Sequence, residues 1–246
     1  SRTPFARMWT CVELYWSQPD IYGEEYGVVS WQLDKLNIHG NSVWTKKVND
    51  SKIGIGLYGE KRNVYKSINF DSLLNPNIKR DIHLGIDFFT TPGINIYAPL
   101  NGKIVILKNN SQKYDYGPTI VLEHSISKNI KFYTLYGHLN EECLKNLTIN
   151  QKIYKGERLA KIGNYPSNGN WPPHLHFQII IDLMHEKDNF PGVCEDFLFD
   201  MWKKISPNPN LFLKISKTFF DNNKNSNFLI KKRKSLISKN FSISYN

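Results

Sequence analysis

The stretch Pro172-Pro173-His174-Leu175-His176-Phe177-Gln178-Ile179 decides the expected fold. In an extended strand successive side chains point to opposite faces, so the three polar residues after the prolines should share one face and the three apolar residues the other. Two positions along a strand are roughly 6.6 Å apart, which lets both imidazoles line one cavity. A half-exposed strand with two solvated histidines is the alternative, because a short motif is weak alone. The rest of the chain favours the cavity.

Around this strand the sequence has the pattern of a mainly β protein. From Ile53 onward, short apolar runs are interrupted repeatedly by Gly, Pro and Asn, and the short turns between several runs favour antiparallel neighbours. Two segments, Asn140–Leu147 and Phe197–Ile205, are predicted to be helical. We therefore expect antiparallel sheets with few short helices. The expected strands are Ile94–Ala98, Gly102–Leu107, Thr119–His124, Ile130–Leu135, Ile153–Tyr154, Arg158–Ile162 and His174–Ile181.

Three segments of the 246-residue chain differ in composition. Residues 1–50 hold four of the six Trp, and we interpret them as an aromatic-rich N-terminal segment or the end of an upstream domain. Residues 51–213 carry the β pattern and are the expected functional domain. Residues 214–246 hold eight Lys or Arg against one acidic residue. With their many Asn and Ser they are typical of a basic linker or tail.

Composition excludes several classes of function. The hydrophobic share of 40% suits a globular core, and no apolar run is long enough for a transmembrane segment. The first residues lack the pattern of a secretory signal. The three Cys have no CxxC spacing, which argues against a disulfide framework and a thiolate zinc site. The net charge of +10 is concentrated in the tail, so we expect no specific nucleic-acid partner.

Two further motifs share the domain with the histidine pair: His83-Leu84-Gly85-Ile86-Asp87 and Tyr136-Gly137-His138-Leu139. Fully extended, the first would separate its His and Asp by about 13 Å, too far for one ion, so we expect a bend or bulge at the glycine. Two histidines and one aspartate would leave zinc one open coordination position, as in catalytic sites. Such an ion lowers the pKa of a bound water and polarises a carbonyl.

These motifs, in this order, resemble the lysostaphin/LytM-type zinc endopeptidases, which cleave peptides of bacterial cell walls. The resemblance covers roughly residues 80–181 and implies a β-sandwich with a groove, a bound Zn²⁺ and a peptide substrate of the peptidoglycan type. By the family pattern the metal ligands would be His83, Asp87 and His176. The catalytic pair would be His138 and His174, and the sequence does not assign which of them is the general base.

The chain departs from the family pattern at three places. Gln178 stands where the family usually has Glu, two residues after the last ligand. The usual Ser-Thr-Gly approach to the final motif is replaced by residues 168–173, and no Tyr shortly precedes His83. None of these changes removes a ligand or a catalytic histidine, but they bear on the choice of substrate.

A narrower similarity concerns a subgroup in which this domain lies in a fusion, between a phosphotransferase-like domain and a class-III aminotransferase. It rests on Ile55–Tyr65, Tyr116–Thr119, Asp188–Val193, Ser206–Asn210 and the string around the two histidines. It implies flanking domains as partners and a cytoplasmic location. The alternative location is the cell envelope, with an export signal outside this sequence.

Two other functions stay open at this point. One is a non-hydrolytic module that binds a peptide or a partner domain, and the other is a hydrolase of small amides within a multidomain fusion. Among the remaining residues, we expect His124 to be structural and His185 to be solvated. Trp171, beside two prolines, is interpreted either as a packing anchor or as a platform for substrate.

Overall fold

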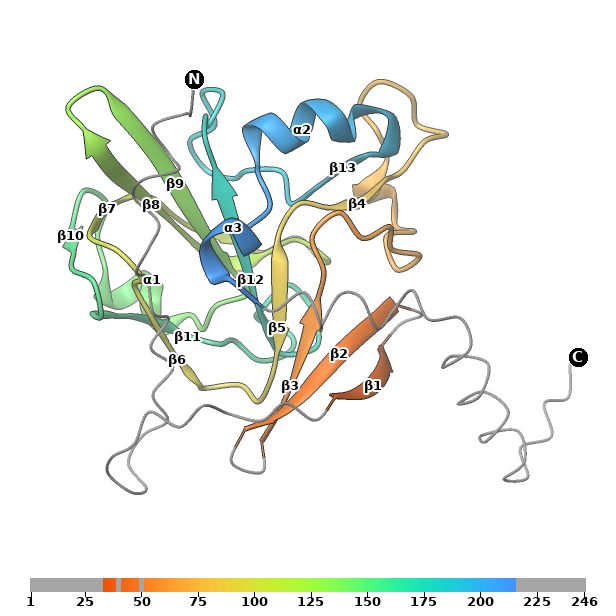
Figure 1. The fold of residues 1–246 in the computed structure, drawn as a ribbon, viewed down its shortest axis with the longest axis horizontal. Coiled ribbons are helices and arrows are strands. Elements are labelled where there is room, and N and C mark those ends of the chain that lie inside the picture. Colours follow the sequence, from red (N-terminus) through yellow and green to blue (C-terminus); the bar gives the residue numbers. More distant parts are fainter. Residues whose placement is uncertain (1–32, 39–40, 49–50, 216–246) are drawn as a thin grey trace, which may run out of the picture. The chain divides into compact units, whose positions relative to one another are not determined.

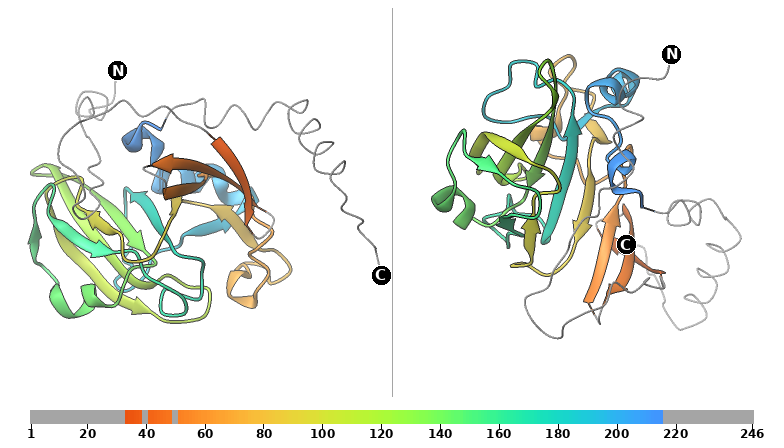
Figure 2. Two further views of the ribbon diagram at one scale, coloured as in Figure 1. Left: turned by 90° about the horizontal axis from the view of Figure 1, so that it is seen from below. Right: turned by 60° about the vertical axis from the view of Figure 1, so that its left-hand side comes forward.

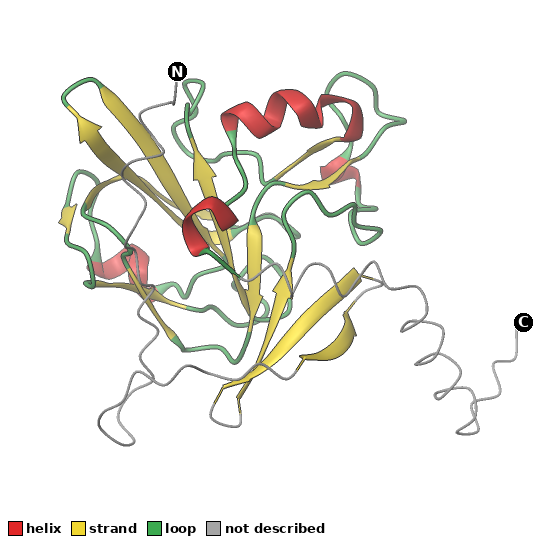
Figure 3. Ribbon diagram, viewed as in Figure 1, coloured by secondary structure: helices red, strands yellow, loops and turns green. Residues whose placement is uncertain are grey.

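The computed structural model describes residues 33–38, 41–48 and 51–215. Its architecture is mainly β with a few short helices, so the expected fold class is confirmed (Figures 1 and 3). Nine strands form one antiparallel sheet in the order β1-β2-β3-β5-β12-β9-β8-β7-β10. These strands are β1 (Leu33–Ile38), β2 (Asn41–Val48), β3 (Ser51–Gly56), β5 (Ile86–Phe89), β12 (His174–Ile180), β9 (Ile130–Gly137), β8 (Gly117–Ser127), β7 (Gly102–Asn110) and β10 (Lys152–Ile153).

Two small antiparallel sheets accompany the large one. In the first, β11 (Arg158–Lys161) pairs with β6 (Asn95–Tyr97), and in the second, β13 (Val193–Glu195) pairs with β4 (Arg80–His83). The turned views of Figure 2 show β5, in yellow, beside the teal β12. The central strands of the large sheet are thus the ones that carry the histidine motif and its neighbours.

The core lies on both faces of the large sheet, because side chains alternate along each strand. One cluster joins apolar residues of β7, β8, β9 and β12 to the small β6–β11 sheet. A second cluster joins the opposite faces of the same strands to β4, β13 and the helix α2 (Phe199–Ile205). On β12, Leu175, Phe177 and Ile179 belong to the first cluster. The predicted apolar face of this strand is therefore confirmed.

The short helices fall where the sequence predicts them, with one addition. The helix α1 (Glu142–Asn146) lies inside the predicted segment 140–147, and α2 lies inside 197–205, preceded by the 3-10 turn η3 (Asp196–Leu198). The helix α3 (Asn210–Leu213) is the addition, since no helix is predicted there from the sequence. Another 3-10 turn, η2 (Ile68–Phe70), lies in the long loop before β4.

The chain divides into compact units of residues 1–213 and 214–246, and every element named here belongs to the first. The domain boundary expected at residue 51 lies between β2 and β3, two strands that pair with each other. The assignment of residues 1–50 and 214–246 as separate segments stays a prediction, since much of both lies outside the described residues. None of the helices within the described ranges has the length and apolar character needed to cross a bilayer.

Candidate metal and catalytic site

The strand β12 lies between β5 and β9, and this position brings the predicted motifs together. His176 lies opposite Asp87 of β5 on one side and Gly137 of β9 on the other. His138 follows directly after β9, and it adopts a positive φ of 63° there. Antiparallel register alone therefore joins three segments that are far apart in the sequence.

The bend expected at Gly85 is present. The strand β4 ends at His83 and pairs with β13, whereas β5 begins at Ile86 and pairs with β12 and β3. The chain thus leaves one sheet and enters another within two residues. A Cβ atom on Gly85 would lie 2.5 Å from Cε1 of His176 and 2.9 Å from the carbonyl oxygen of Phe177. Glycine is needed here because the imidazole occupies the space of a side chain.

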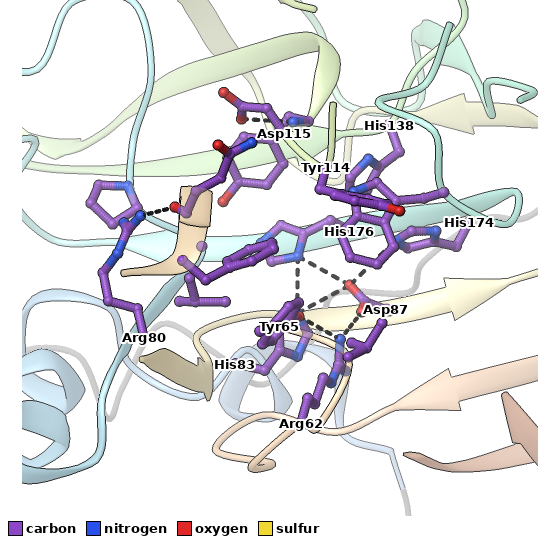
Figure 4. Close-up of a pocket in the computed structure, with 18 of the residues that line it drawn as sticks. Arg62, Tyr65, Arg80, His83, Asp87, Tyr114, Asp115, His138, His174 and His176 are labelled. Atoms are coloured by element: carbon purple, nitrogen blue, oxygen red, sulfur yellow. Dashed lines mark hydrogen bonds and ion pairs between the residues drawn. The ribbon is translucent and has the colours of Figure 1, made fainter. Parts of the chain in front are cut away.

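Three ligand atoms meet beside this bend (Figure 4). Nε2 of His83 lies 3.0 Å from Nδ1 of His176, and each lies close to Oδ1 of Asp87, at 3.2 Å and 3.0 Å respectively. Nitrogen and oxygen ligands of a tetrahedral zinc ion, at about 2.0–2.1 Å from the metal, are about 3.3 Å from one another. The triangle of ligand atoms therefore has the size that a zinc ion requires.

The other atoms of the three side chains show that lone pairs face the centre of this triangle. Nδ1 of His83 lies 3.0 Å from the carbonyl oxygen of Leu57, and Nε2 of His176 lies 2.9 Å from Oε1 of Gln178. Both partners are acceptors, so these nitrogens carry the imidazole protons. Two nitrogen lone pairs and a carboxylate oxygen then converge without a hydrogen between them. Such a donor set fits a cation, and the acceptors are the outer partners that orient histidine ligands.

The charge states of the buried groups suit a cation as well. Burial lowers the pKa of His83 to about 4, with the nearby Arg62 acting in the same direction, so its imidazole is neutral at pH 7. Burial alone would raise the pKa of Asp87, but His83 and Arg62 outweigh it and hold that pKa well below the usual value. The site therefore presents the carboxylate of Asp87 and the neutral imidazole of His83.

His138 and His174 lie beside the triangle, with their ring centroids 4.2 Å apart. Each donates its Nδ1 proton to a backbone carbonyl, His138 to Asn168 at 2.9 Å and His174 to Pro172 at 2.6 Å. Each Nε2 atom is then left as an acceptor, and that of His174 lies 4.0 Å from Oδ1 of Asp87. Burial lowers the pKa of both histidines. Both are therefore neutral bases at pH 7.

A cavity of about 370 Å³ contains the triangle and the histidine pair. Its wall beyond the pair is aromatic: Trp171 has ring contacts with Tyr65, Phe70, Tyr114 and His138. Trp171 thus packs against other rings and lines the cavity at the same time. Aromatic rings thus form a groove beside the candidate metal ligands.

All five predicted site residues line this cavity. His124 lies elsewhere, bonded to Asn101 and Thr134, and is structural as expected. His185 is exposed, also as expected. Arg62 also belongs to this site but is not predicted from the sequence, and its Nη1 lies 2.6 Å from Oδ2 of Asp87. It is 25 residues from Asp87 in a loop, and no spacing rule links the two.

Comparison with known proteins agrees with this geometry. Residues 81–188 match the sequence model of Peptidase family M23. The chain contains an M23 peptidase domain. The matched segment includes the three ligand residues and both histidines of the pair. The narrower assignment to a fusion subgroup has no counterpart among these matches.

Individual relatives of the M23 domain are distant. The peptidoglycan DD-endopeptidase ShyB of Vibrio cholerae is 29% identical over 100 residues, which cover 40% of this chain and 20% of that protein. The match thus spans a fifth of that relative's length. Among solved structures, the lysostaphin catalytic domain from Staphylococcus simulans has a TM-score of 0.37 and 22% identity, covering 63% of this chain and 94% of that one. The M23 protein EnpA from Enterococcus faecalis gives 0.37 and 18%, with 55% and 85% covered.

Proposed function

We propose that the M23 domain is a zinc endopeptidase that hydrolyses an amide bond in a peptide of the peptidoglycan type. The observation that carries this proposal is the convergence of three lone pairs, from His83, Asp87 and His176, on one point inside a cavity. The name of the Vibrio cholerae relative supports the substrate class, and the aromatic groove supports an extended ligand.

A zinc ion held by these three residues would supply a Lewis acid and a water of lowered pKa. The chain itself supplies the proton transfers. With Nδ1 fixed on a carbonyl oxygen, His138 and His174 can each take up a proton only at Nε2. A neutral histidine accepts the proton that the attacking water loses, and the resulting imidazolium can give a proton to the leaving amine. The other histidine would stabilise the developing oxyanion only after its Nε2 has taken a proton from solvent, because the neutral ring has no hydrogen there.

The decisive experiment measures metal content and turnover on the same protein. The purified chain should hold close to one zinc per molecule by elemental analysis and release new amines from muropeptides or glycyl peptides. His138→Ala should keep the zinc and lose at least about 100-fold in turnover, the usual scale for a general base. His83→Ala should lose the zinc. Zinc binding without turnover on any peptide of the panel would overturn the endopeptidase proposal in favour of a binding module or a small-amide hydrolase.

We further propose that the domain works in the cytoplasm beside phosphotransferase-like and aminotransferase domains. The support is the set of strings outside the metal motifs, such as Ile55–Tyr65 and Asp188–Val193, that resemble the fusion subgroup. Fractionation of the native organism, followed by mass spectrometry of the full-length polypeptide, would test this. Recovery of the domain from the envelope, without the flanking domains, would contradict it.

A further inference from the structure

Arg62 is a buried cation in contact with a predicted metal ligand, and the mechanism above does not use it. It lies in the loop after β3 and is 5% exposed. Its Nη1 donates to Oδ2 of Asp87 at 2.6 Å and to the hydroxyl of Tyr65 at 3.0 Å, and its Nε donates to Glu60 at 3.2 Å. Figure 4 shows the guanidinium on the side of Asp87 away from the His138–His174 pair.

The two oxygens of Asp87 have different partners. Oδ1 belongs to the triangle with His83 and His176, whereas Oδ2 accepts from the guanidinium. A carboxylate with both oxygens free can bind a metal through one or both of them. A second metal–oxygen bond would fill the position that a catalytic zinc site leaves open for water or substrate.

We propose that Arg62 is a positioning residue, which reserves Oδ2 of Asp87 and so restricts this ligand to a single bond with the metal. The inference deepens the proposed function and rests on it for the presence of the metal. The ion pair between Nε and Glu60 fixes the guanidinium, so the contact of Nη1 with Oδ2 does not depend on a freely rotating side chain. Burial further strengthens the contact, because the local dielectric is low.

Two features of the structure concern the Nη2 atom of Arg62. Residue 56 of β3 is a glycine, and a Cβ atom at this position would overlap Nη2 of Arg62. Nη2 itself is buried and has no hydrogen-bond partner among the residues that the structure describes. An unpaired buried donor destabilises a fold. The chain thus keeps this guanidinium in a place that stability alone does not favour, which is typical of a functional position.

Arg62 also changes the charge around the ligands. The usual glutamate after the last ligand is replaced by the neutral Gln178, and a positive guanidinium touches Asp87. Both features withdraw electron density from the ligand set compared with a site supported by carboxylates. An ion at this site would therefore be a stronger Lewis acid.

The test uses the full chain loaded with Co²⁺ in place of zinc, because the visible absorption of cobalt reports its coordination number. Arg62→Met removes the guanidinium with little change in volume. Tyr65→Phe is the matched control, since it removes the other acceptor of Nη1 and leaves the contact with Asp87. Four-coordinate cobalt absorbs more strongly than five- or six-coordinate cobalt, so we expect Arg62→Met to lose at least about 3-fold in molar absorption. Tyr65→Phe should keep the intensity of the wild type.

Arg62→Lys is a second variant, which keeps the positive charge. It still tests the inference if Arg62→Met fails to fold. We expect its absorption to lie between those of the wild type and Arg62→Met, at an unchanged ratio of cobalt to protein. Equal spectra for the wild type and Arg62→Met would overturn the inference, as would an equal loss in Tyr65→Phe. The spectra require no turnover. A wild type that binds cobalt in a four-coordinate site but cleaves no peptide would therefore overturn the proposed function and not the role of Arg62.

Discussion

At the scale of single residues, the site is defined by where its imidazole protons lie. Four histidines of the M23 domain each have one ring nitrogen on an oxygen acceptor: Leu57 for His83, Gln178 for His176, Asn168 for His138 and Pro172 for His174. The opposite ring nitrogens then carry lone pairs, which can bind a cation or a proton. Three of these acceptors are backbone carbonyls, so the tautomers are set by the fold and not by mobile side chains.

The burial of neutral histidines predicts a pH-dependent stability for the chelator-treated protein. His83 has a pKa of about 4 in the fold, against about 6.5 in the unfolded chain. Because the folded pKa is the lower one, the stabilisation is present at pH 7 and is lost as the pH falls from 6.5 towards 4. This residue alone should account for about 3 kcal/mol. The pKa values of His138 and His174 are lowered too, and they add to the loss.

Urea unfolding of the chelator-treated chain at pH 7, 5.5 and 4 checks this prediction. A His83→Asn variant should show a shallower fall of the free energy of unfolding with pH. His185→Asn, which changes an exposed histidine, should follow the wild type. A free energy of unfolding that does not change over this range would show that the histidines are not buried in neutral form.

Gln178 gives a second prediction at this scale. Its amide nitrogen donates to the carbonyl of Pro191 at 3.0 Å and to the hydroxyl of Ser206 at 2.8 Å, while its oxygen accepts from His176. In Gln178→Glu a carboxylate oxygen would face the Pro191 carbonyl. We expect the metal-free protein to lose about 1–3 kcal/mol of stability. Metal affinity should rise about 10-fold, because a carboxylate partner makes a histidine ligand more basic.

A competitive chelator titration and a denaturant titration measure the two effects of this substitution. Gln112→Glu provides the matched control, since Gln112 is an exposed residue that lines the same cavity. This control changes the charge equally and should alter neither quantity by more than a small amount. A lower metal affinity in Gln178→Glu would contradict the assignment of His176 as a ligand through Nδ1.

At the scale of secondary structure, the site depends on the junction between β4 and β5. His83 closes a strand of one sheet and Asp87 lies in a strand of another, so the glycine between them sets the distance of the two ligands. The alternation along β12 and the bend at Gly85 could be predicted, because both follow from the short-range geometry of the backbone. The order of strands in the large sheet could not, since it depends on pairings between distant segments. Arg62 was missed for the same reason.

Gly85→Ala should damage the metal site more than it damages the fold. The new Cβ atom would displace the His176 ring or the backbone at Phe177. We expect metal affinity to fall by at least about 10-fold, the lower end for changes that disturb ligand orientation. Gly93→Ala is the control. Gly93 has a φ of 86°, and a Cβ atom added there would have no neighbour within 4 Å. It should lower stability by about 1 kcal/mol through backbone strain and leave metal affinity unchanged.

Equilibrium dialysis with zinc and thermal unfolding of both variants separate the two effects. Equal metal affinity in Gly85→Ala and the wild type would mean that the junction tolerates a side chain. In that case the close approach of His176 to the glycine would not set the geometry of the ligands.

At the scale of the whole molecule, the site lies at the middle of a sheet whose outer strands on one side come from the N-terminal part of the chain. β3 pairs with β5 on one side and with β2 on the other. Residues 1–50 are predicted to be an aromatic-rich segment or the end of an upstream domain, and within them β1 and β2 pair in the sheet of the histidine strand. Composition could not reveal this, because strand pairing follows from register and not from residue content.

Removing residues 1–50 should therefore expose the edge of β3. An unpaired edge strand promotes association and loses its hydrogen bonds to β2. We expect the midpoint of thermal unfolding to fall by about 5 °C or more, which corresponds to about 2 kcal/mol for a chain of this size. Removing residues 216–246 should leave the midpoint unchanged. Calorimetry with light scattering checks both shortened chains, and equal midpoints would contradict a stabilising role for the first two strands.

The preformed triangle of His83, Asp87 and His176 has a consequence for the choice of ion in the cell. Imidazole nitrogens and a carboxylate oxygen bind several divalent metals, and the affinities of such donors generally rise towards Cu²⁺ along the first transition row. The supply of metal during biosynthesis, and not the order of affinities, would then determine which ion the site acquires. Copper or nickel stress would load the site with the wrong metal, and excess zinc would replace that metal only as fast as it is released.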